Sequence, residues 1–315
     1  MFVTIDRRFC GECSGSVFYG PNENEVIADL EKARDYLQSL KTVTPSALED
    51  LRDMDINNVS RAGITSAVLH RLSADHREYP WHVVHLDEPR VVQTSFTVSI
   101  DSIENMIAEI TSLPYKIIKI KMGFDGDEKL PAILKNLSGY LFRVDANGGW
   151  NVEKAEHMIY ELHRAGITLI EQPTDVSLIA EWPHLKGRVP VELCVDEGLN
   201  ELNDYERMAE FVDGINIKMA KSGGIMTALA IARRAQKDHR KVMLGCMVES
   251  SVAIASSVYM SSLADYFDLD GPLLLERDVA EGIRYIDDKV YVDETIIGGP
   301  KLNEKVLPND IAGDH

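Results

Sequence analysis

Five charged residues recur along the middle of this 315-residue chain at nearly constant intervals. These residues are Lys121, Asp145, Glu171, Asp196 and Lys218, and the successive intervals between them are 24, 26, 25 and 22 residues. An interval of about 25 residues is the length of one strand, one helix and two short loops. The spacing therefore predicts that each charge occupies the same place in a repeating βα unit.

The three acidic members of the series have the chemistry of a metal site. Asp145, Glu171 and Asp196 offer hard carboxylate oxygens, the ligand type that Mg²⁺ prefers and that Mn²⁺ also accepts. A single acid at the end of a strand is more often solvated, or caps the next helix. Three acids in register favour a divalent cation, so we predict that they bind Mg²⁺, with Mn²⁺ as a permissible substitute.

Lysine residues flank these acids on both sides. Lys119 and Lys121 stand two positions apart and therefore share one face of a strand, whereas Lys218 ends a later strand, which we expect to lie across from them on the other side of the acids. An ammonium group near a second ammonium and a divalent cation has its charged form disfavoured, which lowers its pKa and provides a neutral amine base near pH 7. Two opposed lysines can remove and return a proton on opposite faces of one carbon, as a racemase or epimerase requires.

The metal and the lysines together indicate the reacting end of a substrate. Removing a proton next to a carboxylate creates an enediolate, and a bound divalent cation stabilises the second negative charge of that species. We therefore expect a substrate that carries a carboxylate and an α-hydrogen.

A further pair of acids indicates the other end of the substrate. Asp268 and Asp270 stand two positions apart at the end of the last predicted strand, and so share one face. Because the three earlier acids already provide the metal ligands, this pair most simply binds an ammonium group; the alternative is that both are turn acids before Gly271 and Pro272. A ligand with a carboxylate at one end and an amine at the other is a dipeptide or a similar zwitterion.

The elements that must position these charges are short apolar strands followed by helices. Runs rich in β-branched residues precede the five charges, at Tyr115–Ile120, Tyr140–Val144, Ile167–Ile170, Val189–Val195 and Ile215–Ile217. Three more strands are predicted at Val91–Ile100, Val242–Met247 and Tyr266–Leu269, and helices at Val152–Ala165, Leu178–Leu185, Asp204–Phe211 and Met226–Asp238. Eight strands buried on both faces, with charges at their carboxyl ends, favour an α/β barrel over an open doubly wound sheet.

The chain ends differ from this repeating pattern. The first strand-like segment, Phe2–Ile5, is followed by a stretch rich in Gly, Ser, Pro and Asn, and then by helical segments at Val26–Leu40, Pro45–Met54 and Ser60–Ser73. We predict an α+β domain over residues 1–89, the barrel over residues 90–285, and a C-terminal segment over residues 286–315 that returns to the first domain or to the barrel edge. Near this last boundary, Tyr285-Ile286 and Lys289–Val292 have the pattern of a hairpin.

Composition excludes several classes of function. A net charge of −18 argues against nucleic-acid and anionic-membrane partners. No apolar run approaches 18 residues and the start lacks the apolar region of a signal peptide, so we expect a cytoplasmic protein. Cys10 and Cys13 form a single C-x-x-C, which is weak support for zinc or redox use without a second pair.

The ordered set of motifs resembles the enolase superfamily, specifically its muconate-lactonizing subgroup and, within that, the dipeptide epimerases. The resemblance spans roughly residues 91–275. The matching residues are Lys119-Ile-Lys121, Asp145-Ala-Asn147, Glu171-Gln-Pro173, Asp196-Glu197, Asn216-Ile-Lys218 with Lys221-Ser-Gly-Gly224, and Asp268-Leu-Asp270-Gly271. Such sites use a Lys base together with Mg²⁺.

The resemblance implies a (β/α)7β TIM-like barrel with an N-terminal capping domain, and a role for each matching residue. Mg²⁺ would be bound by Asp145, Glu171 and Asp196, and the acid/base catalysts would be Lys121 and Lys218, with Lys119 assisting Lys121. The amino terminus of a dipeptide would be held by Asp268 and Asp270. Supporting positions would be Asn147 and Glu197. Glu249 resembles a family position near the pocket and has no assigned role. Only about nine residues precede Cys10, so we expect a shortened capping domain with a reduced substrate lid.

Three interpretations remain open. The first is an isomerase that epimerises a dipeptide at the α-carbon of its C-terminal residue through an enediolate. The second keeps the metal and the enediolate but performs cycloisomerisation or β-elimination, as muconate-lactonizing enzymes or o-succinylbenzoate synthase do. The third is a non-catalytic barrel that binds zwitterionic peptides. The sequence does not decide between a monomer and a homo-oligomer.

Overall fold

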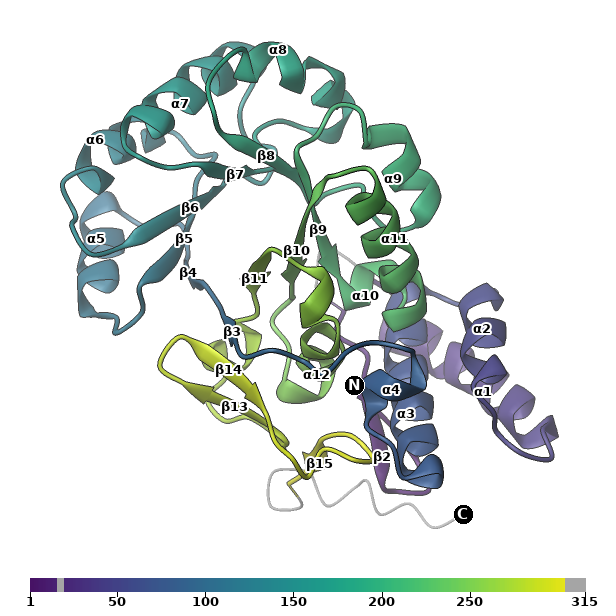
Figure 1. The fold of residues 1–315 in the computed structure, drawn as a ribbon. Helices are drawn as coiled ribbons and strands as arrows, with labels where there is room; N and C mark the ends of the chain where they lie inside the picture. Colours follow the sequence, from purple (N-terminus) through teal and green to yellow (C-terminus); the bar gives the residue numbers. More distant parts are fainter. Residues whose placement is uncertain (16–19, 304–315) are drawn as a thin grey trace.

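A computed structural model describes residues 1–15 and 20–303 of the chain. Its centre is a sheet of eight parallel strands, and Figure 1 shows this sheet curving around a central axis with helices along its outer side. In sheet order the strands are β4 (Phe96–Val98), β5 (Ile117–Lys121), β6 (Leu141–Asp145), β7 (Leu169–Glu171), β8 (Glu192–Val195), β9 (Gly214–Lys218), β10 (Lys241–Gly245) and β11 (Tyr266–Asp268). The predicted barrel is confirmed.

The gap between the first and last strands is bridged by hydrogen bonds. Ser95 N donates to Phe267 O at 3.1 Å, and Leu269 N donates to the Thr94 hydroxyl at 2.7 Å. The predicted strand Val91–Ile100 is divided at this point. Its first part is β3 (Val92–Gln93), which pairs with a different sheet, and its second part is β4 of the barrel.

The helices that follow the strands cover the outer face of the sheet. They are α5 (Ile103–Ser112), α6 (Leu130–Leu134), α7 (Val152–Arg164), α8 (Trp182–Lys186), α9 (Leu202–Met208), α10 (Met219–Ser222), α11 (Ile225–Lys237) and α12 (Ser251–Tyr259), with 3₁₀ turns at Asp127–Lys129, Val176–Glu181, Ser261–Leu263 and Gly271–Leu274. The predicted helix Leu178–Leu185 is a 3₁₀ turn followed by α8, since Pro183 supplies no N–H to a continuous α-helix.

Helix α7 illustrates how the sequence specifies these elements. The Asn151 side chain caps its first turn by accepting a hydrogen bond from Lys154 N at 2.8 Å. Its buried residues, Ala155, Met158, Ile159 and Leu162, recur at helical spacing and pack against the sheet. Its apolar face joins the same core as Val144 of β6 and Ile170 of β7, the two strands that carry Asp145 and Glu171.

The N-terminal segment forms a second unit against the barrel, drawn in purple and dark blue in Figure 1. It contains an antiparallel pair, β1 (Phe2–Ile5) and β2 (Phe9–Glu12), and the helices α1 (Glu23–Ser39), α2 (Ser46–Asp53), α3 (Asn58–His76) and α4 (Pro80–Val83). We call residues 1–89 the cap. Strand β2 has no counterpart among the sequence predictions. Both cysteines around it are buried free thiols, and they donate in different directions, Cys10 to Pro300 O and Cys13 to Ser60 O.

The C-terminal segment contacts both the barrel unit and the cap. The hairpin of β13 (Ile283–Ile286) and β14 (Lys289–Val292) confirms the predicted turn, and β14 also pairs with β3. β15 (Lys301–Leu302) pairs with β12 (Ala280–Glu281), and nearby Pro300 accepts from the Cys10 thiol of the cap. The domain limits at residues 89 and 285 stay predictions, and residues 304–315 of the predicted tail lie outside the described part of the chain.

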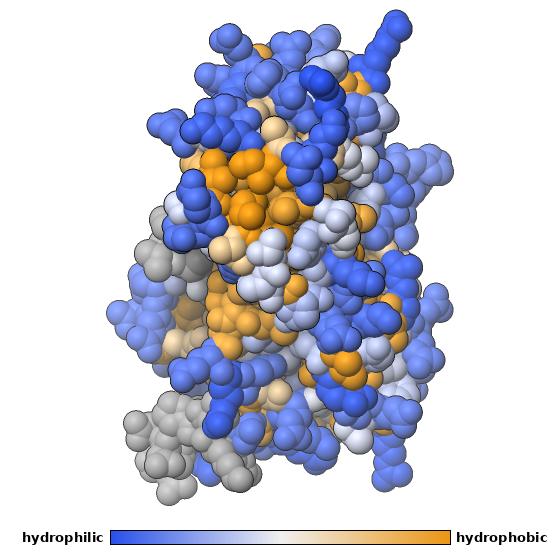
Figure 2. All heavy atoms as spheres, turned by 90° about the vertical axis from the view of Figure 1, so that its left-hand side faces the viewer, coloured by the Kyte–Doolittle hydropathy of each residue, from blue (hydrophilic) through white to orange (hydrophobic). Residues whose placement is uncertain are grey.

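The surface is mostly hydrophilic. Figure 2 shows the side of the molecule that carries α5 and α6, where orange apolar side chains lie among blue polar ones. A few large apolar side chains, among them Ile100, Leu141 and Tyr160, have about half of their surface exposed. Scattered exposed apolar side chains of this kind are normal in folded proteins. In residues 1–15 and 20–303, no helix combines the length and the apolar character needed to cross a membrane.

Candidate active site

The strand register brings the predicted metal acids to one edge of the barrel. Asp145 at the end of β6 lies opposite Glu171 at the end of β7, and Glu171 lies opposite Cys194 on β8. Asp196 follows Cys194 by two residues and therefore shares its face. All three side chains are almost completely buried, with 0 to 3% of their surface exposed.

Lys119 connects these acids to the pair on β11. Its ammonium nitrogen lies 2.9 Å from Asp145 Oδ2, 2.8 Å from Glu171 Oε2 and 2.7 Å from Asp268 Oδ2. A side chain that contacts three other strands must point into the barrel, whereas its neighbours Ile118 and Ile120 are buried on the opposite face of β5. Lys119 thus forms ion pairs with acids of both groups.

The other two predicted lysines stand on either side of the acids. Lys121 on β5 donates to Asp145 Oδ2 at 2.6 Å and to Asn147 Oδ1 at 2.9 Å, and Lys218 on β9 donates to Asp196 Oδ2 at 2.7 Å. The three strands that lead to the metal acids, β6, β7 and β8, lie between β5 and β9. The two lysines therefore approach the acid cluster from opposite sides.

A fourth lysine joins the cluster without having been assigned a role from the sequence. Lys221, on α10, donates from Nζ to Asp196 Oδ1 at 2.6 Å and also contacts the Asp196 carbonyl. Its position next to Lys218 depends on the short helix that immediately follows β9. The Lys221-Ser-Gly-Gly motif is part of the resemblance described above, but the sequence did not predict that Lys221 contacts Asp196.

The charges in this cluster shift each other's proton affinities. Burial raises the pKa of Asp145, but the attraction of Lys119 and Lys121 outweighs burial and lowers it to about 2. Burial and the repulsion of Asp145 raise the pKa of Glu171 to about 7. Asp196 is also buried, yet Lys218 and Lys221 hold its pKa well below the ordinary range. The neighbouring lysines therefore favour the ionised forms of Asp145 and Asp196 at neutral pH.

The chain's own charges shift the pKa of Lys218 upward, whereas the expected lowering depends on a neighbouring divalent cation. Burial lowers the pKa of Lys218, but the adjacent Asp196 carboxylate more than compensates, and the pKa is raised. Lys119 behaves in the same way, because three carboxylates surround its buried ammonium group. The sequence argument placed a divalent cation beside the lysines, and such a cation would compete with them for these carboxylates.

The donor set fits a divalent cation. Within residues 1–15 and 20–303, no group of three or more His, Cys, Asp or Glu side chains has the spacing of a ready-made metal site, because lysine ammonium groups lie between the carboxylates. The carboxylates nevertheless outnumber the lysines at this edge, six to four. Glu197 Oε2 is buried with no hydrogen-bond partner among the described residues, and all the acids offer the hard oxygens that Mg²⁺ prefers.

Two residues around the acids hold their backbone in unusual conformations. Asn147 has φ of 44° and Gln172 has φ of 41°, a region that side chains other than glycine seldom adopt. The Gln172 amide oxygen accepts from the backbone N–H groups of Asp196 and Glu197 at 2.9 and 3.0 Å, so it orients the end of β8. Asn147 Nδ2 donates to Glu197 Oε1 at 3.0 Å, and a supporting role for both residues stays a prediction.

Inside the barrel, Asn216 orients Glu171. Its amide nitrogen donates to Glu171 Oε1 at 2.7 Å. Gly245 makes room for this amide, since a Cβ atom at that position would lie 2.4 Å from Asn216 Oδ1. A close approach of this kind requires glycine.

The second acid pair lies at the adjoining edge, beside β4. Ser95 Oγ donates to Asp268 Oδ1 at 2.6 Å, and Thr97 N donates to Asp270 Oδ2 at 2.7 Å. The Cys246 thiol lies 3.8 Å from Asp270 Oδ1. The attraction of Lys119 overcomes burial and lowers the pKa of Asp268. Among the described residues no ammonium group contacts Asp270, so burial and the repulsion of Asp268 outweigh the weaker attraction of Lys119 and raise its pKa to about 6.

This raised pKa predicts an acid limb in the pH profile of any activity that requires Asp270 as a carboxylate. Because its pKa is raised, Asp270 is increasingly protonated below pH 6 and cannot pair with an ammonium group. We expect kcat/KM for a substrate with a free amino group to fall about tenfold per pH unit below pH 6, since this parameter reports the free enzyme. The Asp270→Asn variant should lose that limb, and an unchanged limb in the variant would contradict the assignment.

Glu249 lies on the cap side of the barrel mouth. It is 2% exposed, its Oε1 accepts from Met247 N at 3.4 Å, and its Oε2 has no hydrogen-bond partner among the described residues. Burial and the repulsion of Glu12 raise its pKa to about 8. The cap residue Glu12, which had no predicted role, is the acid that faces it. A substrate-binding role for Glu249 stays a prediction.

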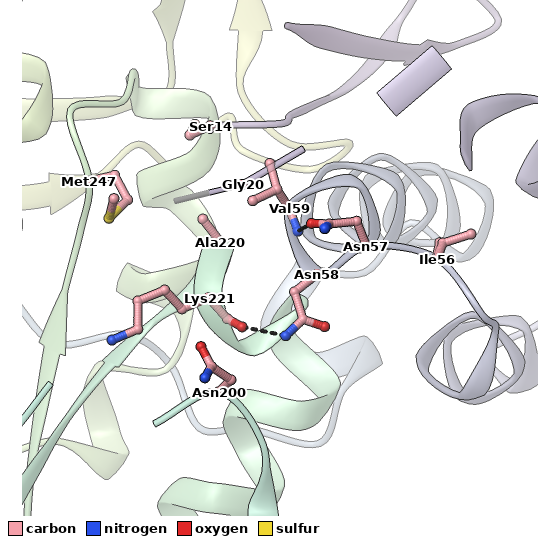
Figure 3. Close-up of a pocket in the computed structure, with 10 residues that line it drawn as sticks. All are labelled: Ser14, Gly20, Ile56, Asn57, Asn58, Val59, Asn200, Ala220, Lys221 and Met247. Carbon is pink, nitrogen blue, oxygen red and sulfur yellow. Dashed lines mark hydrogen bonds between the residues drawn. The ribbon is translucent and has the colours of Figure 1, made fainter. Parts of the chain in front are cut away.

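A cavity of about 530 Å³ lies between the cap and the barrel at this mouth. Figure 3 shows Asn57, Asn58 and Val59 at the start of α3 on one side, and Lys221 and Met247 of the barrel on the other. Asn58 Nδ2 donates to Lys221 O at 2.6 Å, the dashed line in the figure. Since the Lys221 ammonium reaches Asp196, the cavity adjoins the acid cluster.

The comparison with known proteins agrees with this geometry. Residues 101–295, which carry all the barrel acids and lysines described above, match the model of the family described as Enolase C-terminal domain-like. The chain belongs to this family, which is part of the enolase superfamily. The resemblance that the motifs indicated is therefore confirmed.

Two relatives that cover most of the chain are epimerases. The L-Ala-D/L-amino acid epimerase of Maribacter sp. is 29% identical over 297 residues, which are 93% of this chain and 88% of that protein. A substrate-liganded complex of the L-Ala-D/L-Glu epimerase from Bacillus subtilis has a TM-score of 0.83 at 25% identity, covering 96% of this chain and 88% of the other. These similarities identify this member of the superfamily as an isomerase.

A third relative was solved with its ligands bound. The dipeptide epimerase from Methylococcus capsulatus, solved with Mg and the dipeptide L-Arg-D-Lys, has a TM-score of 0.83 at 26% identity and covers 93% of this chain and 87% of that one. In that protein a metal and a dipeptide occupy the same complex.

Proposed function

We propose that this protein is an Mg²⁺-dependent dipeptide epimerase that inverts the α-carbon of the C-terminal residue of its substrate. The observation that supports this reaction most strongly is the placement of Lys121 and Lys218 on opposite sides of the acid cluster. A site with a single base removes and returns a proton on one face only. Two opposed bases allow the proton to leave one face while another arrives on the opposite face.

The acids divide into two groups that match the two ends of a dipeptide. Asp145, Glu171 and Asp196 would hold the divalent cation, which when bound supplies the positive charge that stabilises an enediolate at the substrate carboxylate. Asp268 and Asp270 stand at the adjoining edge, where Lys119 contacts Asp268 and, within residues 1–15 and 20–303, no lysine contacts Asp270. This pair would bind the amino terminus of the dipeptide as a charge-assisted hydrogen-bond acceptor.

The remaining residues would orient the reacting groups. Lys119 contacts both groups of acids. From this position its ammonium group would bind and orient the substrate carboxylate. Asn147 accepts from Lys121 and would fix the direction of its ammonium group. Lys221 would hold Asp196 while Lys218 turns from that carboxylate towards the α-carbon. The cavity beside Lys221 would take a side chain of the dipeptide.

Screening a library of dipeptides in D₂O, read by mass spectrometry, tests this proposal. With Mg²⁺ present, we expect a gain of one mass unit in the substrate dipeptides, and no gain in the presence of a chelator. The mass gain follows from return of a deuteron by the lysine bases. Absence of exchange with every dipeptide, despite Mg²⁺ bound to the protein, would instead indicate a peptide-binding barrel. Loss of water or ring closure of a carboxylate substrate would indicate the lyase or cycloisomerase alternative.

A further inference from the structure

A second and much smaller cavity lies within the contact between the cap and the barrel. Its volume is about 10 Å³, enough for one particle of the size of a water molecule. Its polar lining consists of the Glu12 and Glu249 carboxylates and the Ser66 and Ser256 hydroxyls, whose oxygens lie 3.4 Å apart. The four residues come from β2, α3, the loop after β10, and α12, so cap and barrel contribute two each.

The Glu12 and Glu249 carboxylates differ in the hydrogen bonds that they accept. Glu12 Oε2 accepts hydrogen bonds from Ser250 N at 3.1 Å and from Ser250 Oγ at 2.5 Å. Glu249 Oε2, which is buried in the lining of the cavity, has no hydrogen-bond partner among residues 1–15 and 20–303. A buried carboxylate oxygen without a partner is strongly unfavourable. When Glu249 is ionised, this oxygen therefore favours a cation or a hydrogen-bond donor inside the cavity.

The chemistry of the lining identifies the ligand class. All four polar groups offer hard oxygen atoms, which bind alkali and alkaline-earth cations rather than soft metals. When both carboxylates are ionised they carry two negative charges, since the neutral Ser250 donors stabilise the Glu12 carboxylate without cancelling its charge, and the cavity admits one small particle. We propose that the cavity binds a single alkali cation, K⁺ or Na⁺, which links the cap to the barrel.

A proton competes with such a cation for Glu249. The charged groups that act on Glu249 are Glu12 of β2, which raises its pKa, and Lys218 at the end of β9, which lowers it. The neighbouring Ser14 hydroxyl and the Met247 N–H also lower it, whereas α3, α10 and α12 line the cavity with uncharged residues. Burial dominates and raises the pKa to about 8. Cation binding should therefore strengthen as the pH rises through about 8.

Thermal unfolding of the full chain tests this site without any measurement of catalysis. The Tm is compared in 200 mM KCl, NaCl and tetramethylammonium chloride, whose cation is too large for the cavity, with saturating Mg²⁺ in every sample to occupy the active-site acids. A ligand that binds only the folded state raises the Tm. We expect a Tm about 2 °C higher in K⁺ or Na⁺ at pH 9, with saturation as the salt concentration rises and a smaller difference at pH 6.5.

Substitutions of Glu249 and Ser256, with Glu156 as a control, connect this effect to the cavity. Glu249→Gln removes the charge at nearly constant size and should abolish the difference between salts, whereas Glu156→Gln on the exposed face of α7 should retain it. If Glu249→Gln does not fold, Ser256→Ala removes one oxygen ligand and should raise the K⁺ concentration at half-saturation severalfold. Equal Tm values for the unmodified chain in all three salts at pH 9 would overturn the proposal. An undiminished difference in Glu249→Gln, or an unshifted half-saturation in Ser256→Ala, would also overturn it.

Discussion

Replacing either Lys121 or Lys218 with alanine should lower kcat for dipeptide epimerisation by about 10³-fold, within the range that general acid/base groups contribute. Each lysine reaches a carboxylate of the cluster from its own side, so neither can substitute for the other. Each variant should retain deuterium exchange only from the epimer whose α-proton faces the remaining lysine. Chiral chromatography of the product, together with mass spectrometry of the recovered substrate, measures both quantities.

The control for these variants is Lys237→Ala, which removes an exposed lysine from α11 and should leave kcat unchanged. Saturating Mg²⁺ and a thermal unfolding curve for each variant ensure that a lost activity is not a lost fold. Full activity in both the Lys121 and Lys218 variants would exclude the two-base mechanism. Loss of exchange from both epimers in one variant would show that its lysine acts on both faces.

Replacing Asp270 with asparagine should lower kcat/KM for a dipeptide by 10- to 100-fold, mostly through KM. A hydrogen bond to a charged group contributes about 1.5–3 kcal/mol, and 1.4 kcal/mol corresponds to a factor of ten. The structure favours Asp270 for this test because Asp268 also bonds Lys119, so its removal would disturb the acid cluster as well. Initial rates over a range of dipeptide concentrations separate KM from kcat.

An N-acetylated dipeptide is the matched control, because it lacks the ammonium group that the pair is proposed to bind. The unmodified enzyme and Asp270→Asn should process it equally and slowly. If Asp270→Asn instead leaves kcat/KM for the free dipeptide unchanged, the amino terminus binds elsewhere. A slower reaction of the variant with both substrates would indicate that Asp270 maintains the shape of the site rather than binding an amine.

The barrel and the arrangement of its charges were predictable because both depend on local features. A residue that ends a buried parallel strand lies at the carboxyl edge of the sheet whatever the rest of the chain does, and this rule placed Asp145 and Glu171 correctly. The same reasoning predicted the shared face of Lys119 and Lys121, although not that Lys119 would contact three strands at once.

Other parts of the site depend on contacts between distant segments and could not be predicted in this way. Gln172 orients the end of β8 from a left-handed conformation that no local preference favours. Lys221 reaches Asp196 only because α10 turns immediately after β9. Glu249 faces Glu12 of β2, a strand whose Cys and Gly residues gave no strand signal. Each of these positions results from how the cap, the loops and the barrel pack together.

The most direct test of the proposed reaction is ¹H NMR of an L,L-dipeptide substrate incubated with the protein and Mg²⁺ in D₂O. The proposed mechanism predicts that the α-proton signal of the C-terminal residue disappears while signals of the L,D-epimer appear, with deuterium at that carbon. The α-proton of the N-terminal residue should persist. Exchange at the N-terminal α-carbon, or appearance of the epimer with its original proton retained in full, would contradict it.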